Sequence, residues 1–471
     1  MVACGSCFKY CLKLDFSVGH SVERDYEWQC DVRVHSQSSF VRPLKQTIDC
    51  QREPPALLAP YDPDQNKLAD GDIRTLHGRR FLLVTLPFGP FGRHLRKSLY
   101  ALGAETVDRV AFNAGDALTW RAKGLRRFLG SATEWHRKFP EIASEYTDIV
   151  IFGESGPYNQ TVSTLAKSVP ARLWVLENGY FRPDWITLER NGVNAGSQLP
   201  RVPEGYDPPV PELEVSHSVG RILPYHVMNI STYHLIQLVG GWLYPNYRNP
   251  YTVPAWLQCV SHVQRYFKLA MRSKKEVDAN VLAARGPFFI ACLQREGDNQ
   301  LLRYSKFADN TAFIAKVISS FAQHAPKDAR LVFKNHPLDP GLVDLRAVVR
   351  SLAGARSIGS RVDFVDGGNL ADMCRASSGM VVNNSSAALS ALGFGTPVKV
   401  LGQAFFDFEG LTDQKSLDQF WSAPAKVDTA LFKRFRAHVL SKTQINGNYH
   451  EPRAIKRTAW AVAAAMGRVS S

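Results

Sequence analysis

The chain has 471 residues, more than one hydrophobic core usually supports, so its length predicts two domains. Hydrophobic residues make up 45% of it and charged residues 21%, near the average of soluble proteins. No apolar stretch approaches the roughly twenty residues that a membrane span requires. The formal net charge of +14 predicts an affinity for anions, whether nucleic acid, an acidic lipid surface or a negatively charged small substrate.

The amino-terminal segment, residues 1–78, shows no sustained hydrophobic period, and we expect a poorly ordered extension. It holds five of the eight cysteines, whose spacing is not that of a disulfide framework. Cys4, Cys7 and Cys11 lack the second half of a zinc site. Because the start of the chain also lacks the apolar core of a secretory signal, we expect a reducing, cytoplasmic location.

From Arg79 onwards, short apolar runs typical of buried parallel strands alternate with helix-like spacers. A first series of runs occupies residues 81–86, 107–112, 148–152 and 173–176. A second series occupies residues 287–293, 330–333, 362–365, 379–382 and 397–401. Strands separated by helices imply right-handed crossovers and parallel sheets. The sequence therefore predicts an α/β fold with two Rossmann-like domains facing across a cleft.

These series give the expected domain boundaries. We expect an extension (1–78), an N-terminal Rossmann-like domain (79–240), a helical connection (241–282), a C-terminal Rossmann-like domain (283–425) and basic C-terminal helices (426–471). In the last of these, Phe432, Phe435 and Val439 share one helical face with basic residues around them. This spacing fits a helix that docks on a membrane surface, or one that packs on the protein with a solvated basic side.

Three polar clusters stand where predicted strands end, the place where open α/β sheets bind ligands. His336-Pro337 follows the run 330–333, Glu177-Asn178-Gly179 follows 173–176, and Asn384-Ser385-Ser386 follows 379–382. Proline disfavours helix at the residue before it. The His336 imidazole is therefore expected at the strand exit, where it can donate to a phosphate.

These residue types suit transfer of a sugar from a nucleotide donor. His336, Ser385 and Ser386 can stabilise charge on a departing phosphate, together with the amides of the helix from Ala387. Glu177 can act at the anomeric carbon as a general base or as a nucleophile. Each residue also has a purely structural interpretation: His336 as a loop residue, Glu177 as the ion-pair partner of Arg182 or Arg172, and the serines as a helix N-cap.

A glycine-containing turn at Gly89, after the first strand, has neither dinucleotide nor P-loop spacing, so we expect no dinucleotide cofactor. Arg93 and His94 beside it fit contact with an acceptor or donor anion. No cluster of Asp and His has the pattern of a divalent-cation site, and we expect no metal. A nucleoside monophosphate needs less charge neutralisation on leaving than a diphosphate does, which favours a CMP-type donor.

The order of an acidic cluster with Gly, then His-Pro, then Ser-Ser is similar to that of metal-independent bacterial sialyltransferases and of the Kdo transferases of capsule biosynthesis. More closely, the sequence resembles the KpsS-type capsular polysaccharide synthesis and export proteins over about residues 79–449. The segments that carry this resemblance are Leu86 to Phe91, Phe112 to Asp116, Glu177 to Thr187 and Tyr244 to Arg248.

The resemblance implies a type-B glycosyltransferase that takes Kdo (3-deoxy-manno-octulosonic acid) from CMP-Kdo and places it on a phosphatidylglycerol-type lipid. This step initiates the poly-Kdo linker of an exported capsule at the cytoplasmic face of the bacterial inner membrane, where the enzyme is peripheral. The N-terminal domain would then be the acceptor side and the C-terminal domain the nucleotide-sugar side. Implied partners are the donor, the anionic lipid, the membrane surface and other capsule synthesis and export proteins.

Carried over residue by residue, the resemblance makes Glu177 the carboxylate at the anomeric centre and His336 the donor to the leaving phosphate. The remaining expected contacts divide into a donor site and an acceptor or anion site: Lys334, Asn384, Ser385 and Ser386 for the donor, and Gly89, Arg93, His94 and Arg182 for the acceptor or anion. Asn178 stands where the family has a second acid, which leaves Asp184 as a reserve candidate for the catalytic carboxylate.

Two other classes of function stay open at this point. The chain also fits a non-enzymatic adaptor of the capsule export machinery, whose basic tail recruits it to the membrane. A nucleic-acid-binding protein is disfavoured, because the sequence lacks the interleaved basic and aromatic arrays of the known modules.

Overall fold

The computed structural model describes residues 75–211, 213, 216–249, 279–296, 304–337, 339 and 341–468. Every described residue belongs to one compact unit, Ile73–Ser471. The predicted extension therefore lies outside the described residues except for residues 75–78, of which Leu76 is fully buried. The five cysteines of that extension, with the disulfide and zinc interpretations, lie outside them too.

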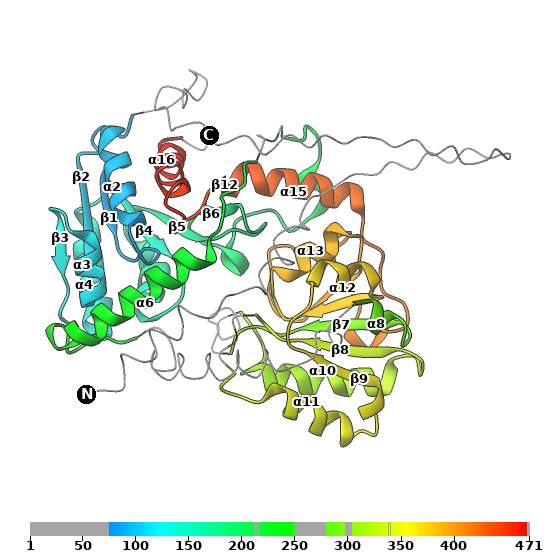
Figure 1. Cartoon of the computed structure of the whole chain (residues 1–471). Coiled ribbons are helices and arrows are strands. Elements are labelled where there is room, and N and C mark those ends of the chain that lie inside the picture. The colour runs from blue at the N-terminus through cyan, green and yellow to red at the C-terminus, as the bar shows by residue number, and fades with distance from the viewer. Residues whose placement is uncertain are drawn as a thin grey trace, which may run out of the picture. The chain divides into compact units, whose positions relative to one another are not determined.

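Within the described residues, seven strands form the first sheet, in the order β12-β6-β5-β4-β1-β2-β3 (Figure 1). They are β1 (Arg80–Leu83), β2 (Thr106–Ala111), β3 (Leu125–Arg127), β4 (Asp148–Phe152), β5 (Arg172–Asn178), β6 (Trp185–Arg190) and β12 (Gln444–Asn446). The neighbours from β5 to β3 run parallel, whereas β6 pairs antiparallel with both β5 and β12. The carboxyl ends of β4 and β5 therefore lie at one edge of the sheet, and Glu177 stands at that edge.

Helices cover both faces of the first sheet. α2 (Phe91–Ala101) and α16 (Ala454–Gly467) pack on one face, and α4 (Ala132–Ser144) and α5 (Pro157–Leu165) pack on the other. Phe81 and Leu83 of β1 point to the first of these cores and Leu82 points to the second, as the two-residue period of a strand requires.

Other helices of this part lie beside the sheet or in its connections. α3 (Ala114–Trp120) packs against α6 (Leu223–Gly240), which is the long helix at the front of Figure 1. Short 3-10 helices join these elements: η3 (Ala166–Ser168), η4 (Asn194–Gly196), η5 (Pro203–Tyr206) and η6 (Gly241–Leu243).

In the part of the chain that the structure describes, five parallel strands form the second sheet, in the order β11-β10-β7-β8-β9. They are β7 (Phe288–Cys292), β8 (Arg330–Lys334), β9 (Val362–Val365), β10 (Gly379–Val382) and β11 (Val398–Val400). Because all five are parallel, the residues that follow them emerge at the same edge. This edge carries His336 after β8 and Asn384 to Ser386 after β10.

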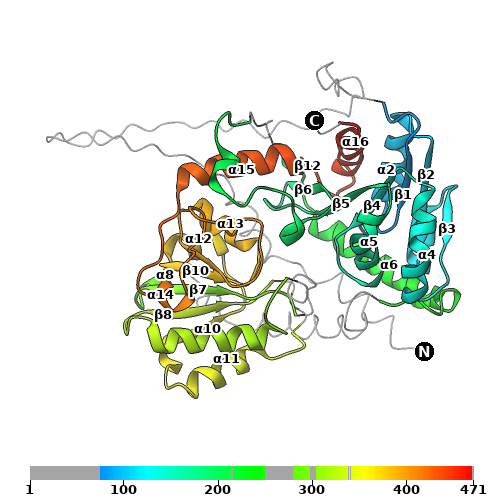
Figure 2. The ribbon, with the colours of Figure 1, turned by 180° about the vertical axis from the view of Figure 1, so that it is seen from behind.

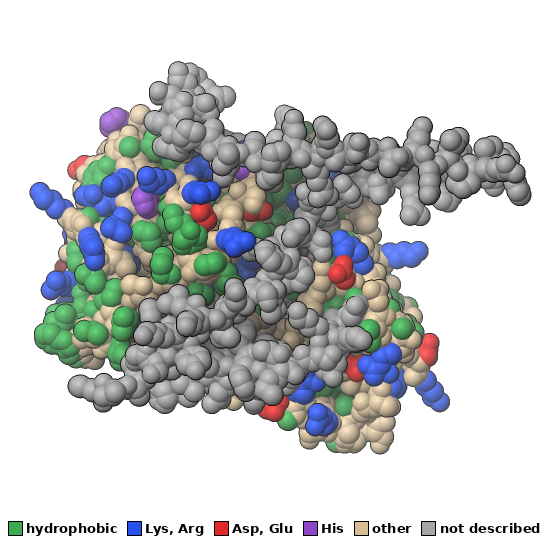
Figure 3. Space-filling model, viewed as in Figure 1, with side chains coloured by type: hydrophobic (Ala, Val, Ile, Leu, Met, Phe, Trp, Pro, Cys, Tyr) green, Lys and Arg blue, Asp and Glu red, His purple; other side chains and the backbone are tan. Residues whose placement is uncertain are grey.

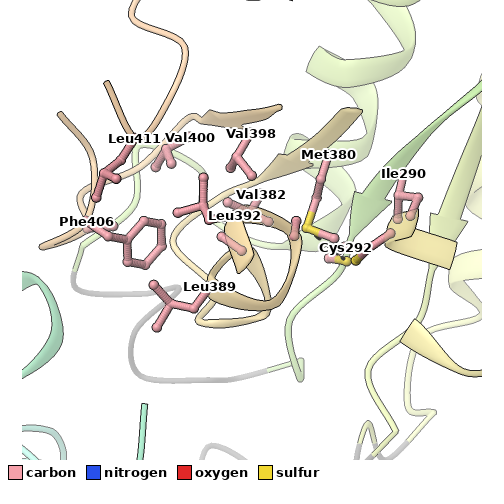
Figure 4. Close-up of a cluster of buried hydrophobic side chains, with 14 of the residues drawn as sticks. Ile290, Cys292, Met380, Val382, Leu389, Leu392, Val398, Val400, Phe406 and Leu411 are labelled. Atoms are coloured by element: carbon pink, nitrogen blue, oxygen red, sulfur yellow. Dashed lines mark hydrogen bonds between the residues drawn. The ribbon is translucent and has the colours of Figure 1, made fainter. Parts of the chain in front are cut away.

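The second sheet is also covered on both faces. α10 (Asn310–His324), α11 (Leu345–Gly354) and α14 (Leu417–Phe420) pack on one face; α8 (Ala279–Ala283), α12 (Leu370–Ala376), α13 (Ala387–Gly393) and α15 (Thr429–Thr443) pack on the other. The 3-10 helix η8 (Gly359–Arg361) precedes β9. In Figure 4, Met380 and Val382 of β10 lie in one apolar cluster with Leu389 and Leu392 of α13, which fixes the loop between β10 and α13 at both of its ends.

The C-terminal segment returns to the first sheet (Figure 2). Ile445 of β12 pairs with Ile186 of β6, and α16 packs along α2. The guanidinium of Arg79 donates to the carbonyl of Met466 (2.5 Å), so the beginning and the end of the described chain meet. The predicted region 426–471 does contain helices, α15 and α16, but they belong to the cores of the two sheets.

The prediction that residues 431–439 dock on a membrane is wrong for the apolar face of α15. Phe432 is 5% exposed, and Phe435 and Val439 are fully buried. The Phe435 ring contacts the rings of Phe405 and Phe408 in the core of the second sheet. The alternative interpretation is correct: the helix packs on the protein and leaves basic residues such as Lys433 exposed. The spacing of apolar residues does not distinguish a membrane-docking helix from a helix packed on the protein, because both need one apolar stripe.

The predicted fold class, an α/β protein with two Rossmann-like domains, is confirmed. All nine predicted apolar runs overlap strands of the two sheets.

Candidate functional site

Glu177 lies at the carboxyl end of β5, beside the end of β4. Its Oε1 accepts hydrogen bonds from the backbone nitrogen of Asn178 (2.8 Å) and from Asn178 Nδ2 (3.2 Å). A Cβ atom on Gly153, whose φ is +69°, would stand 3.2 Å from Glu177 Oε2. The carboxylate therefore lies over the glycine that follows β4, and the amide of Asn178 orients it.

The hairpin from β5 to β6 holds the backbone of Glu177. A Cβ atom on Gly179 would stand 2.1 Å from the Trp185 carbonyl oxygen, so only glycine permits this close approach. The Tyr449 hydroxyl donates to the carbonyl of Glu177 (2.9 Å), and burial raises the pKa of Tyr449 well above its usual range. The reserve candidate Asp184 accepts at Oδ1 from the Val219 backbone nitrogen (2.9 Å), a contact that favours a structural role.

Polar side chains form a layer along the carboxyl edge of the second sheet. Gln294, after β7, donates from Nε2 to Asn384 Oδ1 (2.7 Å) and accepts at Oε1 from Asn383 Nδ2 (3.1 Å). After β8, Asn335 Oδ1 accepts from the backbone nitrogen of His336 (2.9 Å). Since only β7 separates β8 from β10, the two predicted clusters emerge about 10 Å apart, which is two strand spacings.

Ser385 and Ser386 lie between β10 and α13. Ser385 Oγ accepts from the Ala387 backbone nitrogen (3.3 Å), so the capping interpretation fits this serine. Ser386 occupies the N-cap position without capping through its side chain. Together with Asn384 it lines a small pocket of about 10 Å³, enough for one water molecule. The other lining residues are Asn194, Ala195, Gln403, Ala404, Phe405 and Phe406.

Tyr304 connects this edge of the second sheet to residues of the first. Its hydroxyl donates to Glu154 Oε2 (3.5 Å), while its carbonyl accepts from Asn384 Nδ2 (3.2 Å) and from the Gln403 backbone nitrogen (2.9 Å). Glu154 follows Gly153 directly, so these contacts lead from the surroundings of Glu177 to the pocket of Ser386. A direct approach of Glu177 to His336 across a cleft stays a prediction.

Two buried carboxyl groups that sequence reasoning missed lie behind the pocket wall. Glu154 accepts from the Val193 backbone nitrogen (3.0 Å), and Glu189, inside β6, accepts from the hydroxyls of Tyr180 (2.6 Å) and Ser197. Burial, reinforced by the negative charge of Glu154, raises the pKa of Glu189 to about 7.

The same Tyr180 hydroxyl connects Glu189 to the pocket. It accepts from the backbone nitrogen of Asn194 (2.7 Å), and Asn194 has a left-handed backbone (φ +54°) and lines the pocket. Glu154 follows the predicted strand 148–152, so the strand-end rule that found Glu177 could have found it. Glu189 carries no such signal, because an acid inside a strand is usually solvated.

The other predicted donor and acceptor residues lie in the strand-end loops. Lys334 is buried, and its Nζ donates to the Gly367 carbonyl (3.0 Å), which joins the end of β8 to the loop after β9. Arg182 is exposed, and its Nε donates to the Gly179 carbonyl (3.1 Å). Their roles in binding stay predictions.

The turn at Gly89 brings the first strand up to α6. Gly89 has φ +97°, and a Cβ atom on it would stand 2.6 Å from the Asn229 side chain. His94, one turn into α2, is half-buried, and burial together with Lys456, Lys97 and Arg93 lowers its pKa. Three cations around one imidazole make this end of α2 electropositive, which fits the predicted contact with an anion.

Among the described residues, no group of three or more His, Cys, Asp or Glu side chains is arranged to hold a metal ion. In the same part of the chain, no helix combines the length and the apolar character that crossing a membrane takes.

A family model described as capsule polysaccharide biosynthesis protein matches residues 147–450, more than half of the chain. The chain belongs to this family. The match includes Glu177, His336, Ser385 and Ser386. The resemblance predicted from the sequence is therefore confirmed.

Known capsule proteins are similar over most of the chain. It is 32% identical over 400 residues to the capsule polysaccharide export protein KpsS of Escherichia coli, covering 80% of this chain and 98% of KpsS. It is 34% identical over 388 residues to the capsule polysaccharide modification protein LipB of Neisseria meningitidis serogroup B, covering 78% of this chain and 91% of LipB. Among solved structures, the β-Kdo 2,7 transferase of KpsC from Thermosulfurimonas dismutans matches with a TM-score of 0.37 and 13% identity, covering 82% of this chain and 98% of that one.

Proposed function

We propose that this capsule polysaccharide biosynthesis protein is a glycosyltransferase that moves Kdo from CMP-Kdo onto a phosphatidylglycerol-type lipid, initiating the poly-Kdo linker of an exported capsule. The observation that carries the proposal is the pair of contacts made by Tyr304. Its hydroxyl contacts Glu154, next to the glycine under Glu177, and its carbonyl contacts Asn384, next to the paired serines. Two Rossmann-like domains that meet at their strand ends are the arrangement that a type-B glycosyltransferase uses.

The edge of the second sheet would hold the nucleotide. His336 would donate to the phosphate of CMP as it leaves, and Ser385 and Ser386 would accept and donate hydrogen bonds around it. The buried cation Lys334 and the half-buried Arg295 lie at the ends of β8 and β7 and would add positive charge. No metal is required in this scheme, because a monophosphate leaving group is neutralised by these side chains.

Glu177 would act on the sugar. The bond from the Kdo anomeric carbon to the CMP phosphate breaks, and its electron pair leaves with the phosphate. In direct displacement, the acceptor oxygen bonds to that carbon and its proton passes to Glu177. In double displacement, Glu177 first forms an ester with Kdo; the acceptor oxygen then bonds to the anomeric carbon, the ester bond breaks, and the released carboxylate takes the proton of the acceptor hydroxyl. Both routes stay open, and both need the carboxylate orientation that Asn178 maintains.

The relatives with "capsule polysaccharide" in their names support a place for this activity in capsule synthesis. The electropositive end of α2, with Gly89, Arg93 and His94, is the place where we expect the anionic acceptor. A location on the inner face of the inner membrane follows from that acceptor and is part of the proposal.

The proposal is tested by CMP release from CMP-Kdo in the presence of a short-chain phosphatidylglycerol, using the purified full-length protein. We expect the wild type to release CMP and His336→Ala to release it at least about 100-fold more slowly, the usual cost of losing an acid catalyst. The matched control is His324→Ala. His324 is exposed at the end of α10, which precedes β8 and therefore lies at the opposite edge of the same sheet.

A non-enzymatic adaptor is the alternative that this assay excludes or supports. An adaptor would release no CMP, whereas turnover by the isolated protein excludes adaptor function as its sole role. If His336→Ala folds with an unchanged thermal midpoint and keeps the wild-type rate, His336 has no part in the reaction.

A further inference from the structure

The long helix α6 has its apolar side chains outside. Leu238 is 77% exposed, Val239 70% and Trp242, in the following η6, 78%. Further exposed residues of this stripe recur at helical spacing toward the amino end: Leu235, Met228, Val227 and Leu223. A surface helix of a soluble protein normally turns such residues toward the core.

The face of α6 that contacts the protein is polar. His226 Nδ1 lies 2.9 Å from His450 Nε2, and Asn229 Nδ2 lies 3.2 Å from His450 Nδ1. Tyr233 is buried, and its hydroxyl donates to Asp116 Oδ1 (3.0 Å) and accepts from Asn113 Nδ2 (2.7 Å). The pattern of an ordinary amphipathic helix is thus inverted over four turns, and the orientation of α6 is fixed by these hydrogen bonds.

The segment from Phe112 to Asp116, at the start of α3, holds α3 against α6. Asp116 is held by an ion pair with Arg109 (2.9 Å), and Asn113 caps α3. A Cβ atom on Gly115 would stand 2.6 Å from the Tyr233 ring, and one on Gly240 would stand 2.6 Å from the Ala114 Cβ. Small residues on both helices therefore allow α3 and α6 to approach closely, and a rotation of α6 that buried its apolar stripe would break the network.

Exposed cations surround the apolar stripe. Arg221 precedes α6 and Arg248 follows η6, and both are exposed. Arg93 and Lys97 of α2 and Lys456 of α16 are exposed around His94, close to the point where Gly89 contacts α6. Figure 3 shows hydrophobic side chains (green) along the course of α6 and Lys or Arg side chains (blue) beside them over α2.

We propose that the outer face of α6 and η6, from Leu223 to Trp242, docks this protein on an anionic lipid surface. Leucine, valine and tryptophan side chains on one face, with cations along its border, are what an interfacial helix presents to acyl chains and negatively charged headgroups. Phosphatidylglycerol as the anionic lipid rests on the proposed function. The same face carries the electropositive end of α2, so docking would bring headgroups to the expected acceptor residues.

Vesicle cosedimentation of the full-length protein tests this surface. Wild type should bind vesicles of phosphatidylcholine mixed with phosphatidylglycerol more tightly than phosphatidylcholine alone, and salt should weaken the binding. The double variant Leu238→Ser and Trp242→Ser should lose at least about tenfold in affinity, because it removes several buried CH₂ equivalents. Val343→Ser, an exposed apolar residue of the second-sheet part, is the matched control and should bind as the wild type does.

The charge contribution is tested separately. The double variant Lys97→Glu and Lys456→Glu should weaken binding to the anionic vesicles about tenfold and leave binding to phosphatidylcholine unchanged. Lys433→Glu on α15 serves as its control and should have no effect. Binding that is indifferent to both α6 and α2 substitutions overturns the proposal.

The position of Trp242 relative to the lipid can be measured with a conservative variant that should not disturb folding. Trp242→Phe keeps the apolar surface and should keep vesicle affinity, but brominated lipids should quench its tryptophan fluorescence less than that of the wild type. Equal quenching would show that Trp242 stays outside the lipid, contrary to the proposal.

Other occupants of the face give different results. If the Leu238 and Trp242 double variant converts a dimer to a monomer and keeps its vesicle affinity, a second copy covers the face. If it lowers the thermal midpoint and keeps that affinity, another part of this chain covers the face. Either result overturns lipid docking.

Absence of CMP release by the wild type would refute the proposed function and leave the vesicle result unaffected.

Discussion

Replacing Glu189 by glutamine should remove one defined part of the pH dependence of stability. The carboxyl is buried and its pKa is raised from 4.5 to about 7. Below pH 4.5 both folded and unfolded states hold the proton, and above pH 7 neither does. Between these values the folded state keeps a proton that the unfolded state releases, so the free energy of unfolding falls as pH rises. The total fall is about 3 kcal/mol, since the two pKa values differ by about 2.5 and each pH unit between them contributes about 1.4 kcal/mol.

Urea denaturation of wild type and Glu189→Gln at pH 4.5, 6 and 8, followed by tryptophan fluorescence, measures this contribution as a difference. Other titrating groups cancel in that difference. The amide introduced by Glu189→Gln offers an oxygen to Tyr180 and an N–H to Ser197, as the protonated acid does, so the variant should fold. Relative to wild type, its free energy of unfolding should increase by about 3 kcal/mol between pH 4.5 and 8. Glu409→Gln, at an exposed site, should run parallel to wild type. A difference for Glu189→Gln that stays constant within about 1 kcal/mol would refute the raised pKa.

Two further changes test how the site and α6 are held. Gly179→Ala places a methyl group 2.1 Å from the Trp185 carbonyl oxygen and should lower the free energy of unfolding by on the order of 3 kcal/mol in urea denaturation. Gly354→Ala should be neutral or slightly stabilising, because its methyl group would meet no atom within 4 Å outside its own helix backbone and chain neighbours. The pKa of His450 is lowered to about 3 by burial and by His226. Because the unfolded state therefore gains a proton at a higher pH than the folded state does, the free energy of unfolding of the wild type should fall by about 2 kcal/mol from pH 6.5 to pH 5. His450→Gln should lack that loss, and an equal acid loss in both proteins would contradict it.

The hydrogen bonds that His450 makes with α6 explain why its imidazole is neutral. Asn229 Nδ2 donates to His450 Nδ1, so His450 carries its proton on Nε2 and donates to His226 Nδ1. A second proton on His450 would displace the Asn229 amide. Burial lowers the pKa of His226 as well, with Arg295 contributing.

Most of the fold could be predicted because buried parallel strands are continuous apolar runs. Runs such as Asp148 to Phe152 and Gly379 to Val382 have the bounds that the structure gives them. The three strands that were not predicted, β3, β6 and β12, lie toward the two edges of the first sheet, where such a run is not needed. β12 is only Gln-Ile-Asn, and its place depends on pairing with β6, which lies some 250 residues earlier. The orientation of α6 could not be predicted from its apolar residues, because this helix turns its polar side toward the protein and exposes its apolar side.

The positions of the candidate site residues were predictable where polar clusters follow strands. That rule placed the candidates Glu177, His336 and Asn384 at strand ends, as the structure does, and applied to β4 it would also have placed Glu154 there. It could not find Tyr304, which acts from a loop through one hydroxyl and one carbonyl. Nor could it find Glu189, whose pKa is raised by burial in the folded chain although the hydroxyls of Tyr180 and Ser197 donate to it. Such contacts join residues far apart in the sequence, and no local pattern records them.

The late return of the chain to the first sheet has a consequence for biosynthesis. Gln444 accepts from the Tyr180 backbone nitrogen through its side chain (2.8 Å), and Tyr449 donates to the Glu177 carbonyl. On the ribosome, β1 to β6 emerge long before these partners, and the second sheet has time to assemble in between. The catalytic acid candidate would thus acquire its final supports only when translation is nearly complete, so a nascent or prematurely terminated chain would hold an unfinished, inactive first sheet.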